Sequence, residues 1–292
     1  MTNSYPILDP RSPDAPLTRG RRGALGMMIK APRAGASKTR LVPPLTHEEA
    51  ARLSVGFLRD TASNMAEACA EACAADSGNA VQAVAVYTPA GAEGAFENLL
   101  PSGFALLAQR GDSFGERLFN ASDDLLRLGY ESCCLLDSDS PTLPRALLAR
   151  AVAELRRPGE RLVLGPADDG GYYLIGMKRA RRRLFEEIAW STADVLAQTI
   201  ARARELHLDV ALLPAWYDVD DASTLRRLCD ELFDAPPVGD GGGDADDACN
   251  LQLSPYHAPH TRAELVRLLD GEGRSRLLPE SAAAREPGEG VA

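Results

Sequence analysis

The stretch that decides the fold is CCLLDSDSP, residues 133–141. It begins as a short apolar run, which fits a buried strand or one turn of a core helix. Asp137 and Asp139 follow, and Pro141 stops regular structure. A buried parallel strand that ends in this way carries both carboxylates at its carboxyl end, where open α/β sheets bind ligands. Such oxygen donors suit Mg²⁺ or Mn²⁺, whereas the alternative interpretation is a solvated turn that caps the next helix.

The rest of the chain alternates strand and helix patterns around this stretch over roughly 210 residues. Apolar runs predict strands at 24–29, 81–87, 104–108, 132–136, 161–165, 172–177 and 210–213. Amphipathic segments with capping residues predict helices at 46–74, 113–128, 145–156, 191–206 and 221–233. The pattern at 172–177 is typical of an antiparallel strand. We therefore expect one three-layer α/β domain with a mostly parallel central sheet.

Composition divides the chain into four parts. Residues 1–22, rich in Pro, Ser, Asp and Arg, are expected to form a disordered leader before a domain at 23–235. A Pro/Gly/Asp-rich linker at 236–250 precedes a tail, 251–292, with one short helix at 262–269.

Charge and cysteine content narrow the function classes. The net charge of −10 argues against binding to nucleic acid or an anionic membrane. There is no apolar run of about 20 residues and no secretory signal, and the six cysteines lack a C-x-x-C pair. These features indicate a cytoplasmic protein with reduced thiols. None of the four histidines lies in a strand-end loop, which argues against Ser-His-Asp or Zn-His chemistry.

The loop after the first strand is KAPRAGASKTRL, residues 30–41. It carries cations that include Lys30, Lys38 and Arg40, together with Gly35. Backbone N–H groups and basic side chains in such a loop can surround phosphates. The spacing is neither that of a Walker A loop nor that of G-x-G-x-x-G. A solvated basic loop is the alternative, but the concentration of cations in an acidic protein favours phosphate binding.

Two further loops mix glycines with charges after predicted strands. Residues 109–117 contain Gln109, Arg110, Gly115 and Arg117, at a strand-to-helix junction that usually faces a ligand. The alternative there is a turn with a helix cap at Ser113.

The other loop, residues 165–173, contains Asp169, Gly170, Gly171 and Tyr172. Its glycines allow the backbone to approach a ligand closely. The tyrosine can pack a base or a sugar, or belong to the core.

Carboxylates also follow the last predicted strand. Asp221 is explained as a helix cap, whereas Asp218 and Asp220 are not, and alternation points their side chains the same way. Asp220 together with Asp139 would join two distant parts of the chain in one metal site.

Five motifs occur in an order typical of one family: KAPRxGxxKTRL (30–41), QRGDxxGER (109–117), DSP (139–141), GPAxDGGYYLIG (165–176) and WYDVD (216–220). Over about residues 24–233 the chain resembles DUF2064, a glycosyltransferase-A-like family also labelled radical-SAM/selenodomain-associated transferase 1. That family groups with the nucleotide-diphospho-sugar transferases, whose members include the molybdenum-cofactor and phospholactate guanylyltransferases. The resemblance implies a Rossmann-like fold of that superfamily.

The resemblance also implies roles for residues. Asp139 would bind Mg²⁺ or Mn²⁺, and Asp220, with Asp218 beside it, would complete the site. Asp137 stands where the family usually has Gly, so Asp139 is the stronger candidate ligand. Lys38 and Arg40 would stabilise charge on the phosphates, and Asp169 would orient the acceptor or act as a base.

Three functions fit these roles. Nucleotidyl transfer from an NTP to a small phosphorylated or hydroxylated acceptor is slightly favoured by the basic first loop. Glycosyl transfer from a nucleotide-sugar, as the family label says, is the alternative, and a non-catalytic nucleotide-binding regulator is the third. The expected partners are a nucleotide or nucleotide-sugar and a small acceptor, and a homodimer is left open.

Overall fold

The computed structural model describes residues 5–12, 21–35, 37–75, 80–233, 253–271 and 273–277. Within them, one eight-stranded sheet has the order β1-β4-β3-β2-β5-β7-β6-β8. The strands are β1 (Ile7–Leu8), β2 (Arg21–Lys30), β3 (Ala80–Thr88), β4 (Ala105–Ala108), β5 (Ser132–Leu136), β6 (Arg161–Pro166), β7 (Tyr172–Met177) and β8 (Asp209–Leu212).

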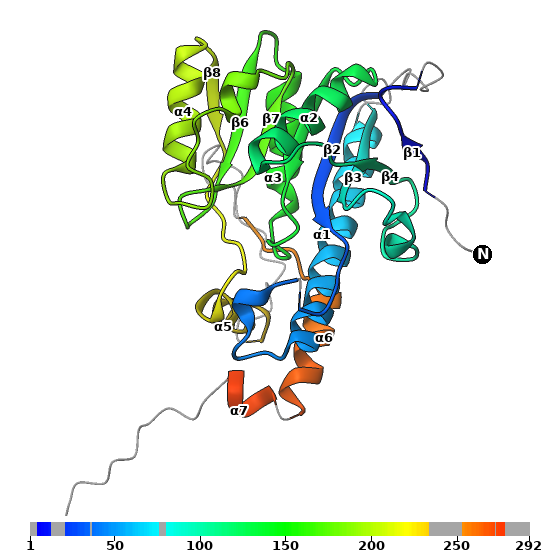
Figure 1. Cartoon of the computed structure of the whole chain (residues 1–292), viewed down its shortest axis with the longest axis vertical. Helices are drawn as coiled ribbons and strands as arrows, with labels where there is room; N and C mark the ends of the chain where they lie inside the picture. Colours follow the sequence, from blue (N-terminus) through cyan, green and yellow to red (C-terminus); the bar gives the residue numbers. More distant parts are fainter. Residues whose placement is uncertain are drawn as a thin grey trace, which may run out of the picture.

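Helices connect most of the strands (Figure 1). The α-helices are α1 (His47–Ala75), α2 (Phe114–Arg127), α3 (Arg145–Arg156), α4 (Val195–Glu205), α5 (Ala222–Phe233), α6 (Pro259–Leu269) and α7 (Gly273–Leu277). The short 3₁₀ helices are η1 (Thr39–Leu41), η2 (Glu93–Phe96) and η3 (Arg182–Phe185). No helix in the described part of the chain is long and apolar enough to cross a bilayer.

All neighbouring strands run parallel except β7, which is antiparallel to both β5 and β6. The predicted α/β domain with a mostly parallel sheet is therefore confirmed, including the antiparallel strand at 172–177. The five cysteines that the structure describes form no disulfide, as expected of reduced thiols.

The sheet is the middle of three layers, because alternate residues of each strand face opposite sides. In β2, Leu25 and Met27 pack in a core with α1 and α3 residues such as Met65 and Leu148. Ala24 faces the other way, into a core that includes Leu125 of α2. Apolar residues buried on both faces are typical of a largely parallel sheet.

The chain order reverses between β2 and β5. From β2 the chain adds β3 and β4 on one side of the sheet, and then returns to place β5 on the other side of β2. The carboxyl ends of β2 and β5 consequently border a topological switch point, which is the usual ligand position in open α/β sheets.

The predicted disordered leader is wrong where the structure describes it. Ile7 and Leu8 form β1, which pairs in parallel with Leu106 and Leu107 of β4, and β2 already begins at Arg21. A strand of two residues is too short to show a periodic pattern, so it could not be predicted from the sequence.

The tail contains the predicted helix, observed as α6, and the short helix α7. The predicted linker at 236–250 lies outside the described residues. Figure 1 shows α6 alongside α1, where the buried Asp60 carboxylate accepts hydrogen bonds from the N–H groups of His260 (3.0 Å) and Thr261 (2.7 Å). A β-carbon on Gly56 would lie only 3.2 Å from Thr261 Cα, so glycine permits this approach. The described tail thus belongs to the domain predicted to end at residue 235.

Candidate active site

Three segments that are distant in the sequence meet at the carboxyl ends of β2 and β5. The loop after β2 carries Lys38, the turn after β5 carries Asp139, and the segment after β8 carries Asp220. The N–H of Val219 donates a hydrogen bond to the carbonyl of Asp139 (2.9 Å) and holds the last two segments together. The backbone therefore fixes the relative positions of the predicted metal ligands.

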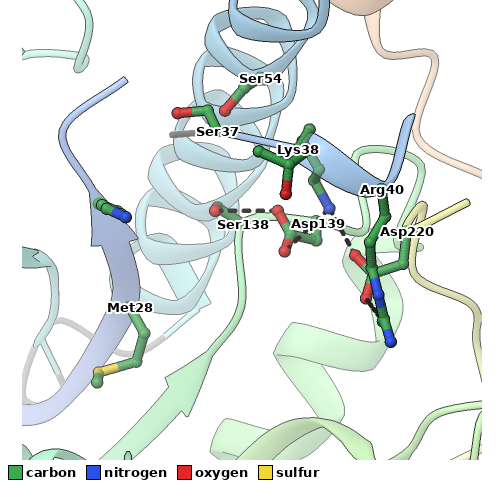
Figure 2. Close-up of a pocket in the computed structure, with 10 residues that line it drawn as sticks. Met28, Ser37, Lys38, Arg40, Ser54, Ser138, Asp139 and Asp220 are labelled. Atoms are coloured by element: carbon green, nitrogen blue, oxygen red, sulfur yellow. Dashed lines mark hydrogen bonds and ion pairs between the residues drawn. The ribbon is translucent and has the colours of Figure 1, made fainter. Parts of the chain in front are cut away.

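The Lys38 ammonium lies between the two carboxylates (Figure 2). Its Nζ is 3.0 Å from Asp139 Oδ2 and 2.8 Å from Asp220 Oδ1, and it donates to the Val219 carbonyl at 2.7 Å. The Lys38 side chain is only 8% exposed. Burial by itself lowers the pKa of Lys38, but the charges of Asp139 and Asp220 outweigh it and raise the pKa. Lys38 consequently keeps its positive charge in this site.

The backbone of Lys38 is left-handed, with φ 48°, and the residue directly precedes η1. A non-glycine residue in this region costs about 1 kcal/mol. The three polar contacts of the ammonium offset this cost, so the local conformation and the ion pairs depend on each other.

Asp137 and Asp218 are carboxylates of a different character. Asp137 Oδ1 accepts a hydrogen bond from Asp139 N (2.8 Å). Burial, with the nearby charge of Asp139, raises the pKa of Asp137 to about 8. Burial, with the charges of Asp220 and Asp169, raises the pKa of Asp218 to about 6. These groups can therefore hold a proton near neutral pH.

A cavity of about 310 Å³, called here the basic cavity, opens beside this cluster. Hydroxyl and cationic side chains dominate its wall, as Figure 2 shows. Its lining consists of Met28, Lys30, Ser37, Lys38, Thr39, Arg40, Ser54, Ser138, Asp139 and Asp220. Cations and hydroxyl donors around one cavity suit an anionic ligand.

A second cavity of about 430 Å³, called here the aromatic cavity, adjoins the first and shares Met28, Arg40 and Asp220 with it. Its lining combines apolar side chains, among them Phe114, Leu118, Tyr172, Ile175 and Trp190, with the acidic side chains of Asp137, Asp169 and Asp218. Two cavities that meet at Arg40 and Asp220 can hold two reactants with their ends together.

The loop between β6 and β7 lies where the sequence predicted. Asp169, Gly171 and Tyr172 line the aromatic cavity, and Asp169 Oδ1 accepts a hydrogen bond from Gly171 N (2.8 Å). Gly170 has φ 89°, and a β-carbon there would collide with the Ala193 carbonyl. The glycine therefore lets the segment before α4 close over this loop.

In the segment 109–117, Gln109 and Arg110 line neither cavity, contrary to the prediction, although Phe114 of the same segment lines the aromatic cavity. Gln109 donates hydrogen bonds to the carbonyls of Ile29 (3.2 Å) and Val86 (2.8 Å), and Arg110 pairs with the buried Asp124 at 2.9 and 2.5 Å. Gln109 thus joins the ends of β2 and β3, and Arg110 joins the loop to the last turn of α2.

The remaining glycines and arginine of these predictions also lie outside both linings. Gly115 packs against Phe185 and Trp190, where a β-carbon would lie 2.8 Å from Phe185 O. Neither Arg117 nor Gly35 lines either cavity.

Several residues of the two linings were not predicted from the sequence. Ser37, Thr39 and Ser138 lie in the predicted site segments 30–41 and 133–141, where only the charged residues and a glycine were predicted to bind a ligand. Ser54 lies within α1 and Trp190 in the segment before α4, with no local signal. A tryptophan in a polar segment is the one feature that could have pointed to a ligand wall.

The predicted three-carboxylate metal set is not assembled. Among the described residues no three His, Cys, Asp or Glu side chains form a metal-binding cluster, and Asp218 lines the aromatic cavity. Around Lys38 Nζ, however, three oxygens converge, from Asp139, Asp220 and the Val219 carbonyl. Hard oxygen donors of this kind fit Mg²⁺ or Mn²⁺ once the ammonium moves aside.

Comparison with known proteins connects this site to a family. Residues 62–192 match DUF2064. The DUF2064 model describes an uncharacterized protein conserved in bacteria, and the match confirms the resemblance found in the motifs. Asp139 and Asp169 lie inside the DUF2064 segment, whereas Lys38 and Asp220 lie outside it. No curated protein is similar enough to the chain to count as a match.

One solved structure shares the fold over most of the chain. A proposed nucleotide-diphospho-sugar transferase from Desulfovibrio desulfuricans G20 is 27% identical, over 85% of this chain and 95% of its own, with a TM-score of 0.65. A cytidylyltransferase from Leptospira borgpetersenii is 9% identical over 89% and 98%, with a TM-score of 0.43. A 4-diphosphocytidyl-2C-methyl-D-erythritol synthase from Anaerococcus prevotii is 9% identical over 72% and 95%, with a TM-score of 0.42. The last two likenesses are too distant to bear on the reaction.

Proposed function

We propose that this protein is a divalent-metal-dependent transferase that moves the nucleotidyl group of a nucleoside triphosphate to a small acceptor. The observation that carries the proposal is the Lys38 ammonium between Asp139 and Asp220, in a cavity also lined by Lys30 and Arg40. Carboxylates and cations together suit a ligand that is both anionic and metal-bound, as nucleotide phosphates are. The DUF2064 match and the neighbour from D. desulfuricans support a transferase that uses a nucleotide.

Each residue has a defined part in this reaction. Asp139 and Asp220 would hold the Mg²⁺ or Mn²⁺ ion, which would supply positive charge to the phosphate oxygens. The acceptor oxygen forms a bond to the α-phosphorus while the bond from that phosphorus to the pyrophosphate oxygen breaks, and pyrophosphate leaves with the bonding electrons. Lys38 and Arg40 neutralise the charge that grows on the leaving group. Asp169 orients an acceptor hydroxyl or takes its proton.

Glycosyl transfer is the second candidate. The neighbour from D. desulfuricans favours it, because that protein is named as a proposed nucleotide-diphospho-sugar transferase. Here the acceptor oxygen would form a bond to the anomeric carbon, and a nucleoside diphosphate would leave. The same cations serve both reactions because both leaving groups are anionic phosphates.

A thermal-shift panel of nucleoside triphosphates and nucleotide-sugars, with and without Mg²⁺, tests the proposal. We expect a Mg²⁺-dependent rise in melting temperature with a triphosphate, and ³¹P NMR should then detect pyrophosphate as the product. A preference for UDP- or GDP-sugars, with a nucleoside diphosphate as product, would favour glycosyl transfer. Failure of every nucleotide to bind would refute both reactions.

Arg40 provides a sharper test of charge stabilisation. Its side chain is 76% exposed, so Arg40→Ala should leave the fold intact and lower kcat by roughly 100-fold. Arg127→Ala is a matched control, because Arg127 is 67% exposed and pairs with a helix neighbour, Asp123, outside both cavities. Equal kcat values in the two variants would remove Arg40 from the mechanism.

A further inference from the structure

The two cavities differ in charge. The basic cavity has Lys30, Lys38 and Arg40 in its wall beside two carboxylates, whereas four carboxylates, with the shared Asp220 among them, and a single cation line the aromatic cavity in the described part of the chain. Asp137, Asp169 and Asp218 form no ion pair with any side chain that the structure describes. Arg40 is the one cation in that lining, within the described residues, and it sits where the two cavities meet.

The aromatic cavity also has aromatic rings in its lining. The rings of Phe114 and Trp190 meet edge to face, with centroids 5.1 Å apart at 84°. Phe114 is 44% exposed, which is unusual for a large apolar side chain in this chain. Gly115 leaves the space that Trp190 fills, because a β-carbon there would lie 2.8 Å from Trp190 Nε1. The ring surface is therefore held in place, and part of it faces solvent.

We propose that the acceptor in the aromatic cavity is a ring-bearing, hydroxyl-rich molecule that is neutral or positively charged and carries neither phosphate nor carboxylate. This inference rests on the proposed function and names its second substrate by class. Aromatic faces pack against the C–H faces of such rings and attract cations. Carboxylates accept hydrogen bonds from hydroxyl and ammonium groups. A phosphorylated acceptor would instead place its negative charge beside the Asp169 carboxylate and beside Asp137 and Asp218, which can hold a proton but offer no positive charge.

The division of charge also fits the direction of the reaction. The hydroxyl oxygen of the acceptor attacks from the aromatic cavity and forms the new bond to the donor, and its proton passes to Asp169. The bond to the phosphate leaving group breaks, and the leaving group takes the bonding electrons into the basic cavity. Negative charge thus stays on the side of Lys30, Lys38 and Arg40.

Direct binding tests this inference without relying on turnover. The chain has two tryptophans, and Trp216 lines neither cavity, so a Trp216→Phe background makes fluorescence report on Trp190. The probes are glucosamine, glucose and myo-inositol, each paired with a monophosphate ester of the same molecule. We expect saturable quenching by the unphosphorylated members, with a Kd at least tenfold lower than that of the matching ester.

Variants test whether the carboxylate charges cause the discrimination against phosphate esters. The double substitution Asp169→Asn with Asp218→Asn should reduce the tenfold discrimination to within about threefold, and Phe114→Ala should weaken both members of each pair. Asp168→Asn is the control: Asp168 neighbours Asp169 but pairs with Arg227 at 2.7 Å and lies outside the lining, so discrimination should not change.

Two results would overturn the inference: tighter binding of the phosphate esters, or no quenching by any of the probes. The nucleotide thermal-shift panel distinguishes this failure from failure of the proposed function. If nucleotides bind and phosphate esters are preferred, only the acceptor class is wrong. If no nucleotide binds, both the transfer reaction and the acceptor role are refuted, whatever the sugars do.

Discussion

Replacing Lys38 with methionine tests how the site is held together without a ligand. Methionine keeps most of the length of the side chain but removes the ammonium. Asp139 and Asp220 would then face each other without the charge that now lies 3.0 and 2.8 Å from them. The Val219 carbonyl would also lose its 2.7 Å hydrogen bond. The variant should therefore unfold more easily than the wild type.

The size of the effect follows from burial. Removing one partner of a fully buried ion pair costs about 3–5 kcal/mol. The Lys38 side chain is 8% exposed, but both carboxylates are 38% exposed and keep contact with water. Solvent screening lowers the cost, so we expect a loss of about 2 kcal/mol. For a chain of this size that is a fall in melting temperature of roughly 4–8 °C.

Differential scanning fluorimetry in EDTA measures this fall, and repetition in millimolar Mg²⁺ measures the rescue. Because Lys38→Met leaves three oxygens without a cation, we expect Mg²⁺ to stabilise the variant more than the wild type. Arg40→Met is the matched control, since Arg40 is 76% exposed and 3.6 Å from Asp220, and its melting temperature should change by less than about 2 °C. A melting temperature of Lys38→Met equal to that of the wild type in EDTA would show that this cluster contributes nothing to the fold.

Three other perturbations have expected outcomes. Asp139→Asn should abolish Mg²⁺-dependent nucleotide binding in calorimetry while the circular dichroism spectrum is kept; unchanged binding would remove Asp139 from the metal site. The pKa of Asp137 is raised to about 8, so ionisation of this residue destabilises the fold. In EDTA, the free energy of urea unfolding of Asp137→Asn should exceed that of the wild type by a margin that grows from pH 5 to pH 8, by up to about 1.4 kcal/mol per pH unit. A margin that stays constant with pH would contradict the raised pKa. Truncation after Phe233 removes α6 and α7 and should lower the melting temperature by at least about 5 °C; an unchanged value would mean that the tail is dispensable for stability.

Much of the fold could be predicted because its signals are local. The strands at 132–136 and 172–177 and the helix at 145–156 appear at the predicted residues, since apolar runs, caps and a proline mark their ends. The strand-end rule likewise placed Asp139 and Asp220 together across the chain. These features depend on short patterns and on a general property of parallel sheets.

The predictions that failed share a physical cause. In each of them the residue's role depends on an interaction partner that is distant in the sequence or has no distinct sequence pattern. Arg110 was expected to face a ligand because nothing local shows that Asp124, a buried residue of α2, neutralises it. Asp60 looked like an ordinary acidic residue of a long helix, yet it is fully buried and caps α6 some 200 residues later. Lys38 was expected in a phosphate-binding loop, and nothing local shows that its side chain is nearly buried between the two carboxylates of Asp139 and Asp220.

The seat of α6 on α1 has a consequence for synthesis of the protein on the ribosome. When the chain has emerged through α5, all eight strands of the sheet are available to pair. Leu53, Phe57 and Leu41, next to the Lys38 loop, still lack Leu265, Leu268 and Leu277, which cover them in the finished molecule. A nascent chain can thus complete its sheet while an apolar surface around the first loop stays open, and that surface is a natural contact for a chaperone until the last helices arrive.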